Sequence, residues 1–573
     1  MDRLTISEVK EKYISGEMTI RQMWKQIKDL AATFEDKNIW IHLLTDEEIE
    51  KYIARLESIE IGELPLWGVP FAIKDNIDLE GIPTTAACAE YSFVPKENAF
   101  VVEKLIEAGA LPIGKTNMDQ FATGLVGTRS PYGEVHNAYR DELISGGSSS
   151  GSAVAVALGM AAFSLGTDTA GSGRVPASLN NLVGWKPSVG AWSNRGVVPA
   201  CESIDCVTVF ANNMDDAEAV DSVVRVFDCD YRYSKKINPV EEKDVKTIYL
   251  PKAEPTFYGD FADLYKEKWN LAVSYITSNY KDVRFIDTAL FSEAASILYD
   301  GPWVAERYAG LKDYLDTNSD TLFPVTKTII CGATKDNKSA VELFTAMHRL
   351  AEIKQYAHQI LEDGVLILPT NGGTFTRQQV DDDPIATNSK MGLYTNHCNL
   401  LDLCAVDIPV GFLEEDLPMG ITIFSKSGNE GLNAKLGKDI SDAMCNMTDI
   451  AVFGLHLKGF QLETQLTDLG AVFKETTQTV AEYKMYALET APAKPGVEKD
   501  LTNGSALEVD IWSIPESKVG AFLKLLPDPL GLGKIKIKDG KEVIGFICQG
   551  YALESAKDIS ACGGWRSYIK SLN

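Results

Sequence analysis

Several features are missing from this 573-residue sequence. No apolar run approaches the roughly 20 residues that a membrane-spanning helix needs. The ten cysteines form no CxxC pair, and the opening MDRLTISEVKEKY lacks the apolar core of a secretory signal. We therefore expect reduced thiols in a cytoplasmic protein, with no metal site, no cofactor and no membrane partner.

Positive charge is also scarce. The chain has 55 lysines and arginines against 81 aspartates and glutamates, a formal net charge of −26. Such an excess of negative charge argues against nucleic acid or an anionic membrane surface as a partner. An anionic substrate would therefore have to be attracted by a local positive site.

What the chain does have is a pair of serine-bearing turns joined by an Ala/Val-rich helical stretch, at residues 144–181. The first turn holds Ser148, Ser149 and Ser150, and the second holds Ser172. A single Gly/Ser cluster is more often a linker. A linker would not run directly into a helix and be matched by a second turn, so the pattern favours a nucleophile and a partner. The free N–H groups of such turns can converge on a developing negative charge.

A nucleophilic serine needs a base, and histidine is a poor candidate here. Of the six histidines, only His136 lies near either turn in sequence, which argues against a Ser-His-Asp arrangement without excluding it. The alternative is a lysine that burial keeps uncharged. Lys74 is the candidate, because it ends the apolar segment 67–73 and is expected at the end of a buried strand.

Helical and strand patterns alternate over most of the chain. Residues 1–62 read as helices, with a capping box at Thr45 to Glu48. A helix closed by Gly109 follows Lys74. We predict strands at 111–114, 247–250, 283–286 and 365–368, and helices at 261–275 and 340–361. This alternation predicts an α/β fold, a sheet covered by helices on both faces.

The composition changes near residues 435–449. Strands are predicted beyond it at 480–488, 507–514, 534–537 and 542–548, with a linker-like segment at 491–496 and a hairpin turn at 538–541. A chain of this length also exceeds one ordinary core. We therefore predict two domains, residues 1–445 and a small β-rich domain, residues 446–573.

Three segments resemble the amidase signature family: GVPFAIKDNID, GGSSSGSA and GTDTAGSGRVPA. The resemblance implies the family's fold, with a mixed sheet, and a Ser-Ser-Lys triad of Lys74, Ser148 and Ser172. In that mechanism neutral Lys74 accepts a proton from Ser148, which follows a cis peptide bond. Ser148 accepts one from Ser172, which attacks the amide carbon. The resemblance assigns the oxyanion hole to the N–H groups of Thr169, Ala170, Gly171 and Ser172.

The turn around Ser172 narrows the resemblance. It reads AGSGR where many amidases have GGSIR, which resembles the allophanate hydrolase branch, as do segments 180–211, 298–310 and 394–411. That branch implies hydrolysis of allophanate, a urea bearing a carboxylate, to ammonia and carbon dioxide through N-carboxycarbamate. It places Gly124, Tyr299 and Arg307 at the substrate, where guanidinium suits a carboxylate. From the residues alone, the alternatives are a helix-surface arginine for Arg307 and a core aromatic for Tyr299.

The segment FGLHLKG at 453–459 resembles the start of a gamma-glutamyl cyclotransferase-like fold. In allophanate hydrolases that domain is proposed to act on N-carboxycarbamate, which makes His456 a candidate participant. The alternative is a packing and dimer module in which His456 is a structural histidine. The resemblance also implies a homodimer and a functional link to a biotin-dependent urea carboxylase.

Three other functions remain open. Two are enzymatic: a general small-amide amidase, and the glutaminase-type subunit of a tRNA amidotransferase, which should lack the accessory C-terminal domain. The third is a non-catalytic scaffold derived from an amidase. It is disfavoured because all three triad positions keep reactive side chains.

Overall fold

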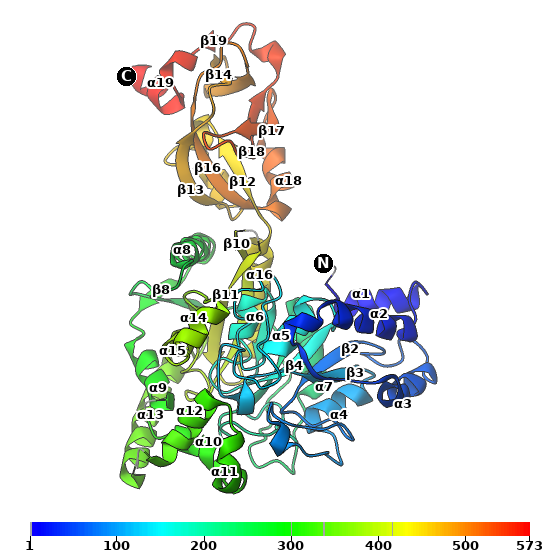
Figure 1. The fold of residues 1–573 in the computed structure, drawn as a ribbon. Coiled ribbons are helices and arrows are strands. Elements are labelled where there is room, and N and C mark those ends of the chain that lie inside the picture. The colour runs from blue at the N-terminus through cyan, green and yellow to red at the C-terminus, as the bar shows by residue number, and fades with distance from the viewer. Residues whose placement is uncertain (1–2, 300, 336–338, 415, 573) are drawn as a thin grey trace. The chain divides into compact units, whose positions relative to one another are not determined.

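The computed structural model describes residues 3–299, 301–335, 339–414 and 416–572, without the side chains of residues 299 and 333–335 (Figure 1). The chain divides into two compact units. The first comprises Met1–Lys268 and Arg284–Asp439, and the second Trp269–Val283 and Ile440–Asn573. No helix in the described part of the chain is long and apolar enough to cross a membrane.

The first unit is built on a mixed sheet that has eleven strands among the described residues. From edge to edge these are β1 (Trp40–Leu43), β3 (Leu111–Thr116), β2 (Pro70–Lys74), β4 (Phe163–Asp168), β6 (Cys206–Ala211), β5 (Val183–Lys186), β10 (Leu403–Glu414), β11 (Leu417–Lys426), β9 (Gly364–Pro369), β7 (Thr247–Pro251) and β8 (Val283–Ile286). Strand β2 runs parallel to β3 and β4, and all three are buried along their whole length. The predicted α/β fold is confirmed.

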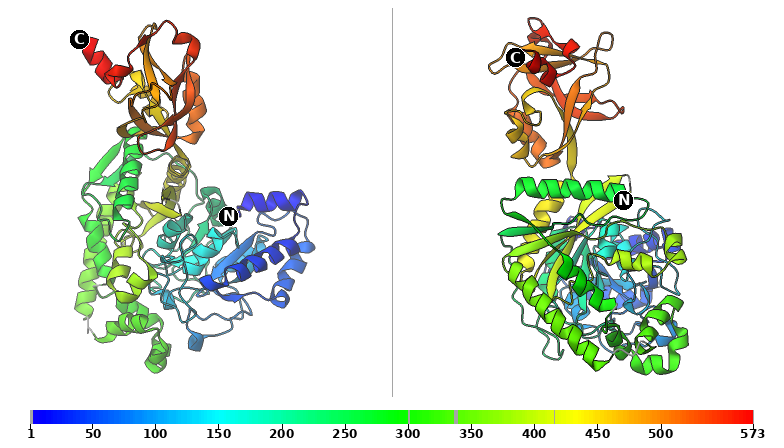
Figure 2. Two further views of the ribbon diagram at one scale, coloured as in Figure 1. Left: turned by 45° about the horizontal axis from the view of Figure 1, so that its top comes forward. Right: turned by 90° about the vertical axis from the view of Figure 1, so that its left-hand side faces the viewer.

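The chain before residue 446 also forms helices. They are α1 (Ile6–Ile14), α2 (Ile20–Thr33), α3 (Asp46–Glu57), α4 (Phe100–Glu107), α5 (Ser150–Ala157), α6 (Val175–Leu179), α7 (Met214–Val224), α8 (Ala262–Asn279), α9 (Ala289–Tyr299), α10 (Val304–Gly310), α11 (Lys312–Asn318), α12 (Pro324–Lys335), α13 (Ala340–Ile360), α14 (Arg377–Asp382), α15 (Ala386–Met391) and α16 (Glu430–Cys445). Of these, α8 and α16 belong partly to the second unit. Helix α5 is wholly buried, and its small side chains let it pack closely on β4 and β2. Helices α9 to α13 gather together in the views of Figure 1 and Figure 2.

The N-terminal segment departs from its prediction in one place. Helix α3 starts at the expected capping box, in which the Thr45 hydroxyl accepts from the Glu48 N–H and the Glu48 carboxylate accepts from the Thr45 N–H. Residues 40–43, however, form β1, antiparallel to β3. The all-helical prediction for residues 1–62 is wrong there. Four residues are too few for a periodicity signal, and their conformation comes from pairing with a distant strand.

The second unit is β-rich, as predicted. One sheet has the order β13 (Val472–Gln478), β16 (Glu508–Pro515), β12 (Met447–Val452), β18 (Glu542–Cys548) and β17 (Leu530–Lys536), and the other β15 (Lys494–Lys499), β14 (Tyr483–Leu488) and β19 (Lys557–Asp558). Helices α17 (Glu463–Thr467), α18 (Glu516–Leu525) and α19 (Trp565–Leu572) complete it. The prediction of a linker at 491–496 is wrong from Lys494 onward, because Lys494 is the first residue of β15. Pro495 is tolerated there since β15 is an edge strand.

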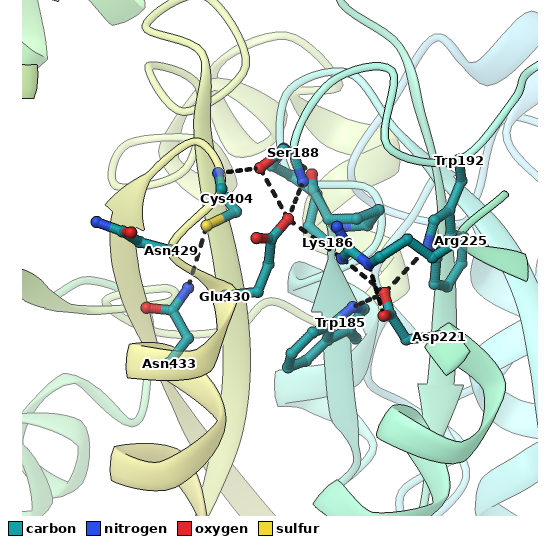
Figure 3. Close-up of polar contacts among 12 residues, drawn as sticks. Trp185, Lys186, Ser188, Trp192, Asp221, Arg225, Cys404, Asn429, Glu430 and Asn433 are labelled. Carbon is teal, nitrogen blue, oxygen red and sulfur yellow. Dashed lines mark hydrogen bonds and ion pairs between the residues drawn. The ribbon is translucent and has the colours of Figure 1, made fainter. Parts of the chain in front are cut away.

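A buried ionic network joins β5, α7 and α16 in the first unit (Figure 3). The carboxylate of Asp221 accepts hydrogen bonds from the indole N–H groups of Trp185, at 3.1 Å, and Trp192, at 2.9 Å. It also accepts one from Arg225 Nε at 2.7 Å, while Arg225 Nη2 donates to Glu430 at 3.2 Å. Asp221 is 1% exposed, so these hydrogen bonds are what makes its burial tolerable.

We expect Asp221→Ala to lower the free energy of unfolding of this unit by about 3–5 kcal/mol, because the substitution leaves buried donors unsatisfied. Denaturant unfolding followed by tryptophan fluorescence measures it, since both indoles belong to the network. Asp215→Ala is the control: it removes an 81%-exposed carboxylate from the same helix and should change stability by under about 1 kcal/mol. Equal losses in the two variants would contradict the assignment.

Candidate active site

Lys74 lies at the end of β2, as predicted, and its side chain is fully buried. Its Nζ donates one hydrogen bond to Ser148 Oγ at 2.8 Å and another to Thr167 Oγ1 at 2.7 Å. Strand β4, which carries Thr167, runs parallel to β2 and then leads into the turn that holds Ser172. The parallel pairing of β2 and β4 therefore brings the amine and the two serine-bearing turns to one end of the sheet.

Burial changes the protonation of this lysine. Loss of hydration disfavours the charged amine and lowers the pKa of Lys74 to about 7. The carboxylates of Asp119, Asp205 and Asp168 oppose the shift, whereas the positive charge of Arg307 adds to it. A large fraction of Lys74 is therefore uncharged near neutral pH, as a base requires.

Ser148 lies just before α5, where the Gly147–Ser148 peptide bond is cis. The loop that follows β3 holds this segment: the Asp119 N–H donates to the Ser148 carbonyl at 3.1 Å, and the Asp119 carboxylate accepts from the Gly127 and Arg129 N–H groups. A Cβ on Gly147 would lie 2.1 Å from Asp119 Oδ2. Only glycine fits before Ser148.

The turn that carries Ser172 is shaped by a buried ion pair. Burial alone would raise the pKa of Asp168, but the positive charge of Arg174 and its hydrogen bonds hold that pKa below its usual value. Asp168 Oδ2 accepts from Arg174 Nε at 3.0 Å, and its Oδ1 accepts from the Gly171 N–H at 2.9 Å. Gly171 has φ +136°, and a Cβ there would lie 2.3 Å from Thr395 Oγ1. Ser172 itself is 4% exposed.

These contacts reduce the number of backbone N–H groups that remain candidates for the predicted oxyanion hole. The N–H of Gly171 is occupied by Asp168, so Gly171 is corrected from donor to turn-forming residue. The N–H groups of Thr169, Ala170 and Ser172 donate no hydrogen bond to any described residue and stay candidates. The Thr169 side chain is fixed separately, because its hydroxyl donates to Asp205 at 2.5 Å.

Of the predicted substrate residues, Arg307 on α10 is 2% exposed, so the alternative of a helix-surface arginine is wrong. Its Nη1 donates to Thr123 Oγ1 at 3.0 Å and to the preceding carbonyl at 3.1 Å. Gly124 follows directly, and a Cβ there would lie 2.4 Å from Asp119 Oδ2. Tyr299 ends α9, and its side chain lies outside the described residues.

A cavity of about 560 Å³ lies between α9, α10, α12 and α15, with Arg129 and Asn396 among its lining residues. Arg129 Nη1 donates to the Thr123 carbonyl at 2.9 Å, the same residue that anchors Arg307. Asn396 follows Thr395, which closely approaches Gly171. Its lining includes neither the predicted triad nor Gly124 and Arg307, so the cavity is linked to the predicted site only through the neighbours of Arg129 and Asn396.

Sequence reasoning missed several residues of this site. Thr167 and Asp168 lie inside the quoted motif GTDTAGSGRVPA, so that motif was their only signal. Asp119 and Asp205 lie far along the chain from Lys74, and only the fold brings their charges within its reach. Burial raises the pKa of Asp205 to about 6, although hydrogen bonds from Thr169 and two backbone N–H groups oppose the shift.

His456 belongs to the second unit, in a single helical turn, Gly454–His456. It is 5% exposed, and its Nε2 makes a 2.9 Å hydrogen bond with Gln465 Oε1. The ring packs edge-on against Phe522 and Phe546. Burial lowers its pKa, which the Gln465 hydrogen bond partly opposes. Both a structural role and a catalytic role are compatible with these contacts.

Comparison with known families agrees with this geometry. The Amidase family matches residues 24–254, and the allophanate hydrolase C-terminal domain matches residues 448–570. The chain is 31% identical over 462 residues to a glutamyl-tRNA(Gln) amidotransferase subunit of Caldanaerobacter subterraneus, covering 75% of this chain and 94% of that protein. This chain therefore belongs to the amidase family.

More specific relatives combine both regions. Urea amidolyase of Saccharomyces cerevisiae is 40% identical over 578 residues, which is 93% of this chain and 31% of that protein. The chain thus spans about a third of the length of that relative. The solved structure of Kluyveromyces lactis allophanate hydrolase superposes with a TM-score of 0.71 at 37% identity, covering 100% of this chain and 99% of that one.

The hydrogen bond between Lys74 and Thr167 yields a prediction about pH. If neutral Lys74 is the base, kcat/KM should reach its maximum well above pH 7. It should fall as the pH drops through about 7, where the amine becomes protonated. Thr167→Val removes an acceptor that stabilises the charged amine. It should therefore lower the lysine pKa and move the acid limb of the pH profile to lower pH.

The control is Thr167→Ser, which keeps the hydroxyl and should keep the wild-type limb. Lys74→Met should lose about 10²- to 10⁴-fold in kcat/KM at every pH. An acid limb at the same pH in wild type and Thr167→Val would contradict the role given to this contact.

Proposed function

We propose that this chain is an allophanate hydrolase, releasing ammonia and carbon dioxide from allophanate through N-carboxycarbamate by a Ser-Ser-Lys acyl-enzyme mechanism. The observation that carries the proposal is the buried Lys74 amine, 2.8 Å from Ser148 Oγ. It stands in a chain that matches both the Amidase family and the allophanate hydrolase C-terminal domain. The first feature supports the chemistry, and the second supports the substrate.

In the proposed reaction Ser172 attacks the terminal amide carbonyl of allophanate. Ser148 accepts the Ser172 proton and passes its own to Lys74, which later supplies a proton to the leaving ammonia. Water then hydrolyses the acyl ester by the same relay, releasing N-carboxycarbamate. The candidate donors for the oxyanion are the N–H groups of Thr169, Ala170 and Ser172, each worth about 3–4 kcal/mol in comparable sites.

Arg307 supports an anionic substrate. Because the chain carries a net charge of −26, the overall field repels an anion. Arg307 supplies a buried positive charge, and two hydrogen bonds from one of its nitrogens fix the guanidinium plane. Together with Gly124 and Tyr299 it is proposed to bind the substrate carboxylate.

Other features of the proposal concern the whole chain. We place the domain boundary after residue 445, so that an amidase domain with N-terminal helices precedes a C-terminal domain resembling the gamma-glutamyl cyclotransferase-like fold. That domain, with His456, is proposed to act on N-carboxycarbamate. A cytoplasmic location, a homodimer and a functional link to a biotin-dependent urea carboxylase are part of the same proposal. Urea amidolyase is the relative that supports the link.

A role as an amidotransferase component is the second candidate function, favoured by 31% identity over nearly the full length of that relative. It leaves the C-terminal domain without a role, since that domain matches a different family. A general amidase likewise gives no role to a buried cation beside the triad.

A covalent label tests whether Ser172 is the nucleophile. An aryl phosphonate should attach to Ser172 and be found there by mass spectrometry, because the relay makes this hydroxyl nucleophilic. Ser172→Ala should give no adduct and lose allophanate turnover, while Ser222→Ala, on the exposed face of α7, should behave as wild type. Labelling only at other serines would exclude the mechanism.

The role of Arg307 is tested by substrate preference. Arg307→Gln should lower kcat/KM for allophanate by roughly 10- to 100-fold through loss of a charge-assisted contact, and have a smaller effect on a neutral amide such as acetamide. Arg232→Gln, which removes a 69%-exposed arginine from the same unit, should leave both rates unchanged. Ammonia release measures each rate. Equal losses on the two substrates would remove the argument for carboxylate binding.

A further inference from the structure

The second unit contains a cavity of its own, of about 260 Å³, lined by residues from 453 to 546. Its size suits a small ligand, below the range of typical drug-sized sites. Most of the wall is apolar, and the polar lining consists of His456, Gln461, Gln465 and Lys494. A few polar groups in an apolar wall are the usual composition of a small-molecule site.

The contact with Gln465 determines which nitrogen of His456 carries the hydrogen in the neutral ring. An amide oxygen can only accept a hydrogen bond, so the 2.9 Å contact with Gln465 Oε1 requires the hydrogen on His456 Nε2. In the neutral ring, Nδ1 is then the acceptor, and it makes no hydrogen bond with any described residue. Phe522 and Phe546 hold the ring edge-on, which limits its rotation.

Lys494 gives the cavity a positive charge. It opens β15, and no ion pair joins its amine to any carboxylate in the described part of the chain. The strand comes close because Gly454 lacks a side chain: a Cβ there, at φ +73°, would lie 2.3 Å from Pro495 Cδ. Gly454 lies two residues before His456, and its lack of a side chain lets the strand that begins with Lys494 approach the same cavity.

We propose that Lys494 binds the carboxylate of a small anion in this cavity, and that Gln465 is a positioning residue that keeps His456 Nδ1 as the acceptor for an N–H of that anion. The ligand class is a small carboxylated amine. The identification of N-carboxycarbamate, an N–H between two carboxylates, as the natural member of this class rests on the proposed function. Lys494 pairs with one carboxylate, and His456 Nδ1 accepts from the central nitrogen.

The role of Gln465 is tested by ¹⁵N NMR of the full chain labelled at histidine, with the His456 signals assigned from their absence in His456→Asn. Wild type should show the Nε2–H tautomer. Gln465→Glu keeps an acceptor and should keep this tautomer, whereas Gln465→Leu should give a mixture of both. An unchanged tautomer in Gln465→Leu would overturn the positioning role.

Malonate tests the role of Lys494, because it is a stable dicarboxylate of the same shape as N-carboxycarbamate. Malonate should shift the His456 signals of wild type. The Kd from this shift should rise at least ~10-fold in Lys494→Met and be restored in Lys494→Arg, which keeps the charge. Lys534→Met removes an 81%-exposed lysine from the same unit and should bind malonate as wild type does.

A malonate Kd that is the same in Lys494→Met and wild type, or His456 signals that malonate does not move, would overturn the proposal. These outcomes are separable from those of the proposed function. Labelling of Ser172 and ammonia release report on the first unit, and either can succeed while malonate binding at His456 fails.

Discussion

The site depends on an amine that the fold deprives of water. Lys74 ends a strand buried along its whole length between two parallel neighbours, so its Nζ meets protein hydroxyls in place of solvent. Desolvation leaves a large fraction of the amine uncharged near pH 7, so the lysine can accept a proton where another enzyme would use histidine. Three carboxylates lie close enough to oppose this shift, and Arg307 opposes them. The lysine is therefore balanced between opposing charges, and a small local change should move its pKa.

A compensated buried charge also shapes the turn that carries the predicted nucleophile, Ser172. Asp168 is buried, and its carboxylate accepts hydrogen bonds from Arg174 and from backbone N–H groups of the turn. These contacts stabilise the negative charge and fix the shape of the turn. The N–H groups of Gly171 and Gly173 are thereby engaged by Asp168, whereas those of Thr169, Ala170 and Ser172 are bonded to no described residue. Gly171 and Gly147 are needed for a related reason. Each lies where a Cβ would collide with a polar side chain, of Thr395 or Asp119, that also packs against the site.

Much of this could be predicted from sequence, but only where the signal was local. Lys74 at the end of an apolar segment and the capping box before α3 were local patterns, and the structure has both. Strand β1 and the opening of β15 could not be seen, because pairing with distant strands determines them. The occupied N–H of Gly171 could not be found either. A motif lists which donors are present, but it does not say which one a neighbouring carboxylate takes.

The excess of negative charge gives the two proposed sites a common requirement. The overall field of a chain of net charge −26 repels an approaching anion, so its binding must come from a cation placed at the site itself. Arg307 and Lys494 meet that requirement differently. The guanidinium is held by hydrogen bonds to the loop after β3, which suits fixed, bidentate recognition of one carboxylate. The flexible side chain of Lys494, at the start of an edge strand, can adjust its position to a smaller ligand. In that proposed site the fixed group is the His456 imidazole, which Gln465 orients. Each proposed site therefore relies on a cation held at the site, which has to overcome the repulsion of an anion by the chain's overall negative charge.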